Sequence, residues 1–107
     1  MTLSREVIRR AIRKASRSIS KYKVSALGFS YKGDLICQSM NRPRFSREGG
    51  GIHAEMELMF RGGPGLKTIL LCRTNNAGEI LRLDPCEACA SKATELGIKI
   101  VSLKEGR

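Results

Sequence analysis

The chain has 107 residues, 41% of them hydrophobic, and a formal net charge of +10. This length accommodates one domain at most, which we place at residues 1–107, and it is enough to bury a core of modest stability. No apolar run approaches the roughly 18 residues that a membrane-spanning helix needs, and the basic N-terminus lacks the apolar block of a secretory signal. We therefore expect a cytoplasmic protein without membrane contact.

The positive charge is concentrated near the N-terminus. Residues 1–23 contain eight Lys/Arg and one Glu, whereas the rest of the chain contains twelve Lys/Arg and nine Asp/Glu. Such charge attracts phosphate groups and polynucleotides, but it is equally typical of a solvated helix face that keeps a small protein soluble. Nucleic acid therefore stays open as a partner.

The first half of the chain predicts a helix followed by a hairpin. Apolar residues recur every four positions over residues 3–19, beside a row of arginines, as in an amphipathic helix. Residues 23–31 alternate as a strand does, Lys32-Gly33-Asp34 indicates a tight turn, and residues 35–40 are the returning strand. Residues 41–52 are predicted to be a loop rich in arginine and glycine.

The second half alternates helices and strands. A helix is predicted from about residue 53 to residue 60, with a glycine-rich terminator at residues 61–65. An apolar run at residues 68–73 reads as a central strand, extended as a hairpin by residues 79–83 after a turn at residues 75–78. Pro85 fits the first turn of a third helix that reaches about residue 96, and Gly97 caps it before a last strand at residues 98–103.

This order of elements predicts an α/β fold. Helices that alternate with strands after residue 53 imply parallel strands with right-handed crossovers. We predict a three-layer α/β/α arrangement, in which three helices cover a mixed sheet of about four strands. The apolar last strand would form an exposed edge, and because isolated edges are usually protected, we expect a homo-oligomer.

Two short motifs carry the chemistry: His53-Ala54-Glu55 and Pro85-Cys86-Glu87-Ala88-Cys89. They supply one imidazole and two thiolates, which are ligands that zinc favours. Protein groups fill all four positions of a structural zinc site, so three ligands leave one position for water. Glu55 adds a carboxylate that can move protons. The pattern therefore predicts one catalytic Zn²⁺ per subunit, which makes its bound water acidic.

The spacing of these residues suits two helix starts. Cys86 and Cys89 are three positions apart, so they share one helix face, and the partial positive charge of the first turn favours the thiolate form. His53 and Glu55 can reach one site from the first turn of a helix that points end-on at the metal. The two helix starts would then meet beyond the ends of parallel strands, where ligand crevices form in open α/β sheets.

Other interpretations exist for the single pieces. Cys37 and Cys72 lie in apolar runs and fit small buried hydrophobes, with a third thiolate ligand as the alternative. A lone Cys-x-x-Cys is also typical of a redox pair or of half a zinc ribbon, and a lone histidine at a helix start is more often a cap or a surface residue. The joint pattern, which includes the chain's only histidine, favours the catalytic metal.

Together the motifs resemble the zinc-dependent cytidine and deoxycytidylate deaminase superfamily, whose signature has the same residue types in the same order. The resemblance extends over nearly the whole chain. It implies that His53, Cys86 and Cys89 hold the zinc. It also implies that Glu55 takes a proton from the water, protonates the ring nitrogen beside the attacked carbon and later helps ammonia to leave.

Substrate recognition is less specified by the resemblance. It implies that the backbone amide of Ala54 contacts the base and that Asn41 contacts the nucleoside. Asn41-Arg42-Pro43 also resembles a segment of the bacterial tRNA adenosine deaminases, which leaves cytosine and adenine both open. The basic loop favours a phosphorylated substrate, with Arg42, Arg44 and Arg47 as candidate phosphate ligands or as solvated loop charges.

Our main hypothesis is hydrolytic deamination of a small cytosine nucleotide or nucleoside: dCMP, deoxycytidine or cytidine to the uracil product plus ammonia. The alternative is a deaminase that acts on cytosine or adenine within single-stranded DNA or RNA, where Phe45 could stack on a flipped base. A third hypothesis is an inactive binding module stabilised by zinc. Glu55 speaks against it, because a structural zinc has no use for that carboxylate.

Overall fold

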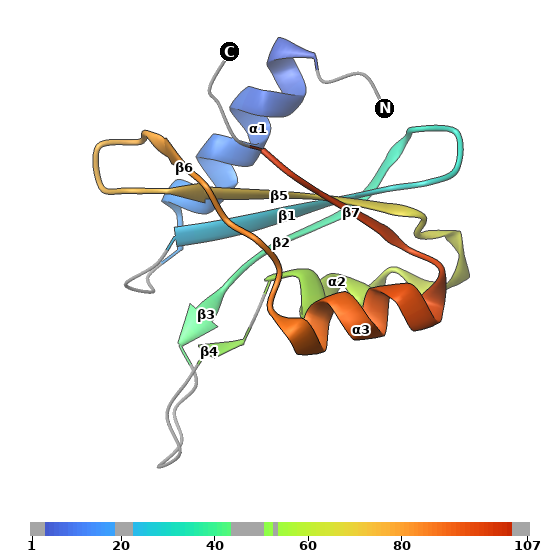
Figure 1. Cartoon of the computed structure of the whole chain (residues 1–107). Helices are drawn as coiled ribbons and strands as arrows, with labels where there is room; N and C mark the ends of the chain where they lie inside the picture. Colours follow the sequence, from blue (N-terminus) through green and yellow to red (C-terminus); the bar gives the residue numbers. More distant parts are fainter. Residues whose placement is uncertain (1–3, 19–22, 44–50, 53, 104–107) are drawn as a thin grey trace.

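The protein is built on a β-sheet with helices on both faces (Figure 1), as seen in a computed structural model. The structure describes residues 4–18, 23–43, 51–52 and 54–103, and for residues 42–43, 51–52, 55–57 and 60 it describes the backbone alone. The strands of the main sheet are β1 (Lys23–Phe29), β2 (Leu35–Met40), β5 (Thr68–Thr74), β6 (Ile80–Leu81) and β7 (Lys99–Ser102).

The sheet is mixed, as predicted. Its order is β2, β1, β5, and then β6 and β7, which follow one another along the far edge of β5. β1 is antiparallel to both β2 and β5, whereas β5 and β7 are parallel. The parallel pairing predicted for strands after residue 53 is therefore confirmed for β5 and β7.

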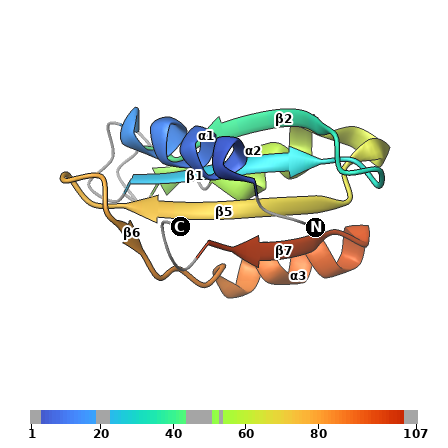
Figure 2. The same cartoon turned by 90° about the horizontal axis from the view of Figure 1, so that it is seen from above.

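Among the described residues, three α-helices form the outer layers, again as predicted. The helix α1 (Arg5–Ser16) covers one face of the sheet, and α2 (Ala54–Arg61) and α3 (Glu87–Leu96) cover the other (Figures 1 and 2). The central strand β5 serves both layers, because successive side chains of a strand point to opposite faces. Leu70 and Cys72 belong to the core beneath α1, whereas Ile69 and Leu71 belong to the core beneath α2 and α3.

The helix α1 is shorter than the predicted span of residues 3–19, and serines explain both limits. Ser4 is the N-cap, since its hydroxyl accepts a hydrogen bond from the Val7 amide at 3.2 Å. Near the other end, the Ser16 hydroxyl donates to the Ile12 carbonyl at 2.9 Å, and the Ser18 hydroxyl bonds to Asn41 instead of to the helix. Serine hydroxyls that compete for backbone partners in this way favour helix ends.

Both predicted turns are confirmed. The β1–β2 connection closes through the Gly33 amide, which donates to the Ser30 carbonyl at 2.9 Å, and Gly33 takes the positive φ of 89° that favours glycine. The β5–β6 turn is organised by the side chain of Asn75, whose Oδ1 accepts from the amides of Ala77 at 3.0 Å and Glu79 at 2.9 Å. An asparagine oxygen that accepts from the amide two residues on is an Asx-turn.

The prediction of a plain loop at residues 41–52 was wrong at its two ends. β3 (Arg42–Pro43) and β4 (Gly51–Ile52) pair in an antiparallel ladder separate from the main sheet. Two residues on each side are too few to show the alternation that identifies a strand, and proline is normally a strand breaker. A 3-10 turn, η1 (Gly63–Gly65), follows α2 where the sequence predicts a terminator.

Two further findings concern the described part of the chain. The four cysteines all lie within it, and no disulfide joins any two of them. None of the helices that the structure describes is long and apolar enough to cross a membrane.

Candidate metal centre and active site

The start of α3 presents the two predicted thiols. Cys86 is the N-cap, and its Sγ accepts a hydrogen bond from the Cys89 amide at 3.4 Å, in the place that a serine or aspartate oxygen usually takes. The helix begins at Glu87, so Pro85 precedes the cap and does not lie in the first turn as predicted. Cys89 is fully buried and Cys86 is half-buried, so the two sulfurs sit where the helix start meets the core.

The start of α2 holds the other motif. Ala54 is fully buried, and its carbonyl accepts a hydrogen bond from the Ser39 hydroxyl of β2 at 2.6 Å, which fixes this helix start against the sheet. The backbone of Glu55 lies in the first turn of α2, and its side chain is outside the described part. His53 also lies outside the described residues.

The two helix starts converge at one end of the sheet, as the spacing predicts. Ala54 and Cys89 belong to the same core cluster, and Cys86 packs against it. In Figure 1 both helices begin at the end of the sheet where β5 terminates, and β7 runs parallel to β5 toward that end. Each helix start carries a partial positive charge, which favours thiolates and other anions there. In open α/β sheets, ligands usually bind at such a place, beyond the carboxyl ends of parallel strands.

The other two thiols are not candidates for the metal. Cys72 is fully buried on the opposite face of the sheet, beneath α1. Burial raises the pKa of its thiol to about 11, a shift that a hydrogen bond with Ser25 partly offsets, so the sulfur stays protonated. Burial also raises the pKa of Cys37, and the nearby Arg61 charge opposes this. Cys37 pairs with Gly28 near the hairpin end of β1, away from the helix starts.

Asn41, predicted to contact a nucleoside, makes hydrogen bonds that hold neighbouring elements of the fold together. Its Oδ1 accepts hydrogen bonds from the Val24 amide and from the Ser18 hydroxyl, both at 2.8 Å. The acceptor must be the carbonyl oxygen, because a backbone N–H can only donate. Asn41 therefore ties the end of α1 to the end of β2, and any contact of its side chain with a substrate would come from the amide nitrogen.

The three arginines proposed as phosphate ligands fall mostly outside the described residues. The backbone of Arg42 lies in β3, opposite Ile52, and its side chain is not described. Arg44 and Arg47 lie outside the described residues, as does Phe45.

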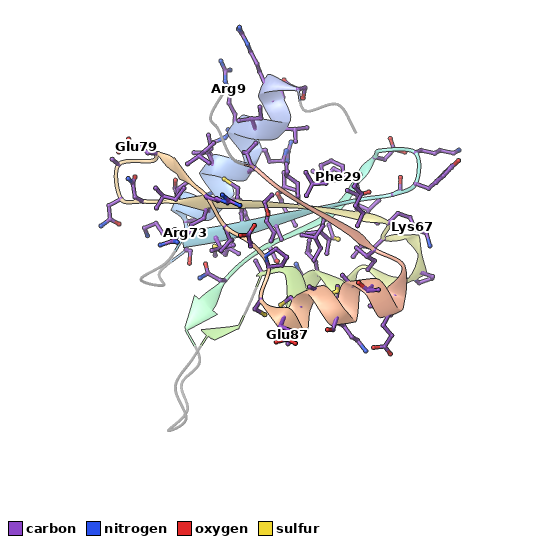
Figure 3. All side chains as sticks on the ribbon, in the orientation of Figure 1. Arg9, Phe29, Lys67, Arg73, Glu79 and Glu87 are labelled. Atoms are coloured by element: carbon purple, nitrogen blue, oxygen red, sulfur yellow. The ribbon has the colours of Figure 1, made fainter. Side chains whose placement is uncertain are left out.

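One cation of the site face was missed by sequence reasoning. Arg73 follows Ile69 and Leu71 at two-residue intervals on β5, so its side chain leaves the sheet on the face that α2 and α3 cover (Figure 3). It lies at the end of β5 where the helix starts converge, and its Nε is buried. In the sequence, Arg73 continues the alternating series of Ile69 and Leu71, and a charged residue in such an apolar series is the signal that could have identified this cation.

Comparisons with known proteins agree with this fold. No protein-family model matches the sequence, and a search of curated proteins finds no match either. Among solved structures, the cytidine deaminase from Mycobacterium leprae matches with a TM-score of 0.61 and 23% identity, over 89% of this chain and 83% of that one. The cytidine deaminase from Mycobacterium tuberculosis matches with a TM-score of 0.59 and 18% identity, over 94% of this chain and 85% of that one. The chain therefore has a cytidine deaminase-like fold.

Proposed function

We propose that this chain, which shares the fold of cytidine deaminases, is a zinc-dependent enzyme that hydrolytically deaminates a cytosine nucleoside or nucleotide. One observation carries the proposal: the start of α3, which holds the two thiols, and the start of α2, at Ala54, converge at one end of the sheet. His53 directly precedes Ala54 in the sequence, and Glu55 directly follows it. A His-x-Glu motif followed later in the chain by a Cys-x-x-Cys motif is the sequence signature of the zinc deaminases.

The donor set fits Zn²⁺. Two sulfurs and one imidazole nitrogen are borderline-soft ligands, which favour zinc over Mg²⁺ or Ca²⁺. The Sγ of Cys86 already accepts an N–H from its own helix, and a thiolate is the stronger acceptor for that bond. Cys86, Cys89 and His53 would hold the ion and leave one position for water. When bound, Zn²⁺ supplies a Lewis acid that brings the ionisation of water close to neutral pH.

The remaining chemistry requires a proton carrier, which we assign to Glu55. Its carboxylate would accept a proton from the attacking water and deliver it to N3 of the cytosine ring. Water oxygen adds to C4 as a hydroxyl, Glu55 carries the proton of that hydroxyl to the amino group, and the C4–N bond then breaks. The products are uracil, with a new C4 carbonyl, and ammonia. Proton transfer of this kind typically contributes about 10²–10⁴-fold to the rate.

Groups around the two helix starts would hold the nucleoside. The first amides of α2, beginning with Ala54, lack intrahelical acceptors and point toward the start of the helix, where they can donate to a base. The side-chain amide of Asn41 and the guanidinium groups of Arg42, Arg44 and Arg47 are further candidates, and Arg73 adds a cation on the site face. A guanidinium binds a phosphate through two parallel hydrogen bonds, which is why a nucleotide is favoured over a free base.

An ammonia-release screen tests the proposal. Purified zinc-loaded protein is incubated with cytosine, cytidine, deoxycytidine, dCMP, adenosine and short oligonucleotides. We expect ammonia from at least one cytosine nucleoside or nucleotide, loss of that activity after chelation, and recovery on adding Zn²⁺. Zinc-loaded protein that releases no ammonia from any of these compounds would instead support the inactive binding module. We also expect a homo-oligomer in the cytoplasm, which light scattering and fractionation can check.

A further inference from the structure

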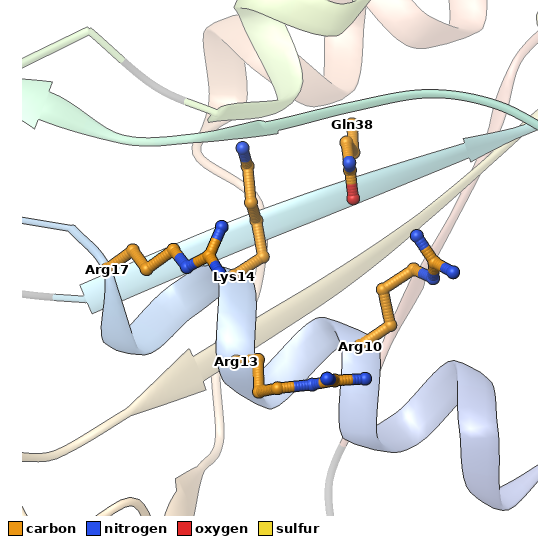
Figure 4. A pocket seen from close by; sticks show the side chains of 5 residues that line it. All are labelled: Arg10, Arg13, Lys14, Arg17 and Gln38. Atoms are coloured by element: carbon orange, nitrogen blue, oxygen red, sulfur yellow. The ribbon is translucent and has the colours of Figure 1, made fainter.

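We propose that a basic groove between α1 and β2 is a docking site for the phosphate backbone of a single-stranded polynucleotide. Four cations of α1 and its C-cap line this groove on one side, and a single amide of β2 lies across from them (Figure 4). The groove volume is about 190 Å³, several times the roughly 30 Å³ share of one water, so a phosphodiester group fits inside it. The lining residues are Arg10, Arg13, Lys14, Arg17 and Gln38.

The helix period explains why these cations line up. Positions 10, 13, 14 and 17 are three or four residues apart, so their side chains share one side of α1. The helix buries a different side against the sheet, through Ile8, Ala11 and Ala15. Gln38 reaches the groove from β2, because it lies on the face of the strand opposite to that of Ser39, which bonds to α2.

The positive charge of the groove is not neutralised within the described part of the chain. Among the described residues, ion pairs join Arg82 to Asp84 and Lys92 to Glu95, and neither pair involves α1. The only acidic residue of α1 is the exposed Glu6, in its first turn. Like charges at these spacings destabilise a helix, so an anionic partner that neutralises them would stabilise α1.

The length of the charged row favours a chain of phosphates over a single small anion. Residues 10 and 17 are seven positions apart, which corresponds to about 10 Å along the helix. Arg5 and Arg9 are exposed on the same helix and extend the charge toward its start. Positive grooves that track a phosphate backbone are typical of proteins that bind single strands without sequence preference.

The groove is separate from the candidate active site but is connected to the same end of the sheet. α1 and the helices α2 and α3 cover opposite faces (Figure 2). Ser18, directly after Arg17, donates to Asn41, and Asn41 directly follows β2 at the end of the sheet where α2 begins. A strand bound in the groove would thus leave it near the two helix starts. Binding does not depend on the proposed deamination and can be measured without it.

Fluorescence anisotropy with a labelled oligothymidylate tests the proposal. The test variant is Arg10→Ala/Arg13→Ala/Arg17→Ala, and the control is Lys32→Ala/Lys67→Ala/Lys99→Ala, which removes the same charge from exposed positions outside the groove. We expect wild-type affinity to fall with salt, and the test variant to bind at least about tenfold more weakly with a salt slope lower by about two, since each single-strand phosphate contributes about 0.7. The control should change both quantities much less.

Other outcomes would overturn the proposal. Equal losses of oligonucleotide affinity in the two variants would show that binding depends on net charge alone and not on the groove. Displacement of the oligonucleotide by a nucleoside triphosphate at equal phosphate concentration would indicate a small-nucleotide site, and equal binding to phosphatidylserine vesicles would indicate a lipid surface. Circular dichroism checks that both variants fold. Ammonia release from deoxycytidine should be the same in wild type and test variant, so failure of this proposal and failure of the deaminase proposal give different results.

Discussion

The two faces of the sheet carry helices of opposite character. α1 has five Lys/Arg and one Glu, whereas α2 and α3 together have two Lys/Arg and four Glu. α1 lies along the sheet, and its exposed side forms the basic groove. α2 and α3 instead present their starts to one end of the sheet, where the thiols lie.

The two faces therefore offer different things: the α1 face has the charge that attracts an anion, and the α2–α3 face has the thiols that could hold a metal. The α1 face has the charge to hold a polyanion, but in the described part of the chain its one thiol, that of Cys72, is fully buried beneath α1 and cannot act on it. The α2–α3 face is net acidic along its helices, so an anionic substrate would depend for attraction on the helix starts, on Arg73 and on the arginines proposed as phosphate ligands. Each face can therefore be altered while the other is measured.

Loss of a thiol at the helix start should have the largest effect. Cys89→Ala removes a proposed zinc ligand, so we expect zinc content and ammonia release both to fall to background. Cys37→Ala is the matched control, because it removes a thiol from the same face of the sheet away from the helix starts. Elemental analysis of the two purified proteins measures the difference, and full zinc content in Cys89→Ala would refute the assignment.

Removal of the proton carrier should leave the metal in place. Glu55→Gln keeps the size of the side chain but cannot take up a proton, so we expect kcat to fall by about 10²–10⁴-fold with zinc content unchanged. The groove variant Arg10→Ala/Arg13→Ala/Arg17→Ala should retain its turnover of deoxycytidine in the same assay. A Glu55→Gln protein that loses zinc and fold together would indicate a structural role for this residue.

Burial of Cys72 beneath α1 should make stability depend on pH. Its thiol loses a proton near pH 9.0 in the unfolded chain but near pH 11 in the folded protein, so the unfolded state binds fewer protons between these values. The free energy of unfolding therefore falls as pH rises through this interval, by about 1.4 kcal/mol per unit at most. Urea denaturation of wild type and Cys72→Ala at several pH values measures this, and parallel pH profiles would contradict it.

Asn41 offers the finest distinction, because its side-chain oxygen holds the fold together whereas its side-chain amide is a proposed substrate contact. Asn41→Ala removes the acceptor of the Val24 amide and should cost about 1–3 kcal/mol of stability. Asn41→Asp keeps the acceptor oxygens but loses the side-chain amide. We expect Asn41→Asp to lose less stability than Asn41→Ala in urea denaturation, and to have a lower kcat/KM than the wild type. Wild-type kcat/KM in a stable Asn41→Asp would remove Asn41 from the proposed substrate contacts.

Much of the fold could be predicted because its elements have clear local periods. The apolar run at residues 68–73 does become the central strand, and Gly97 ends α3 in the left-handed conformation, with a φ of 72°. The errors lie where local patterns compete or are too short. Ser4 at the start and Ser18 after the end make α1 shorter than its apolar period predicts. The two strands of the β3–β4 ladder are too short to show the alternation typical of a strand.

The candidate site could be predicted only where its residues are close in sequence. The spacing of Cys86 and Cys89 predicts two thiols at one helix start, which the structure contains. The position of Arg73 depends instead on the register of β5 within the sheet, and the groove depends on how α1 packs on the sheet beside β2. Both depend on contacts between segments that lie far apart in the sequence, and the local spacing of residues does not predict such contacts. The sequence could not show that the basic helix lies on the face opposite to α2 and α3.

X-ray absorption at the zinc edge of the purified protein tests the central claim most directly, because it counts the sulfur ligands. The account predicts two sulfurs at about 2.3 Å and two lighter atoms at about 2.0–2.1 Å, one from His53 and one from solvent. The Glu55→Gln protein should give the same spectrum. A third sulfur, which would have to come from Cys37 or Cys72, or a protein that binds no zinc, would contradict the account.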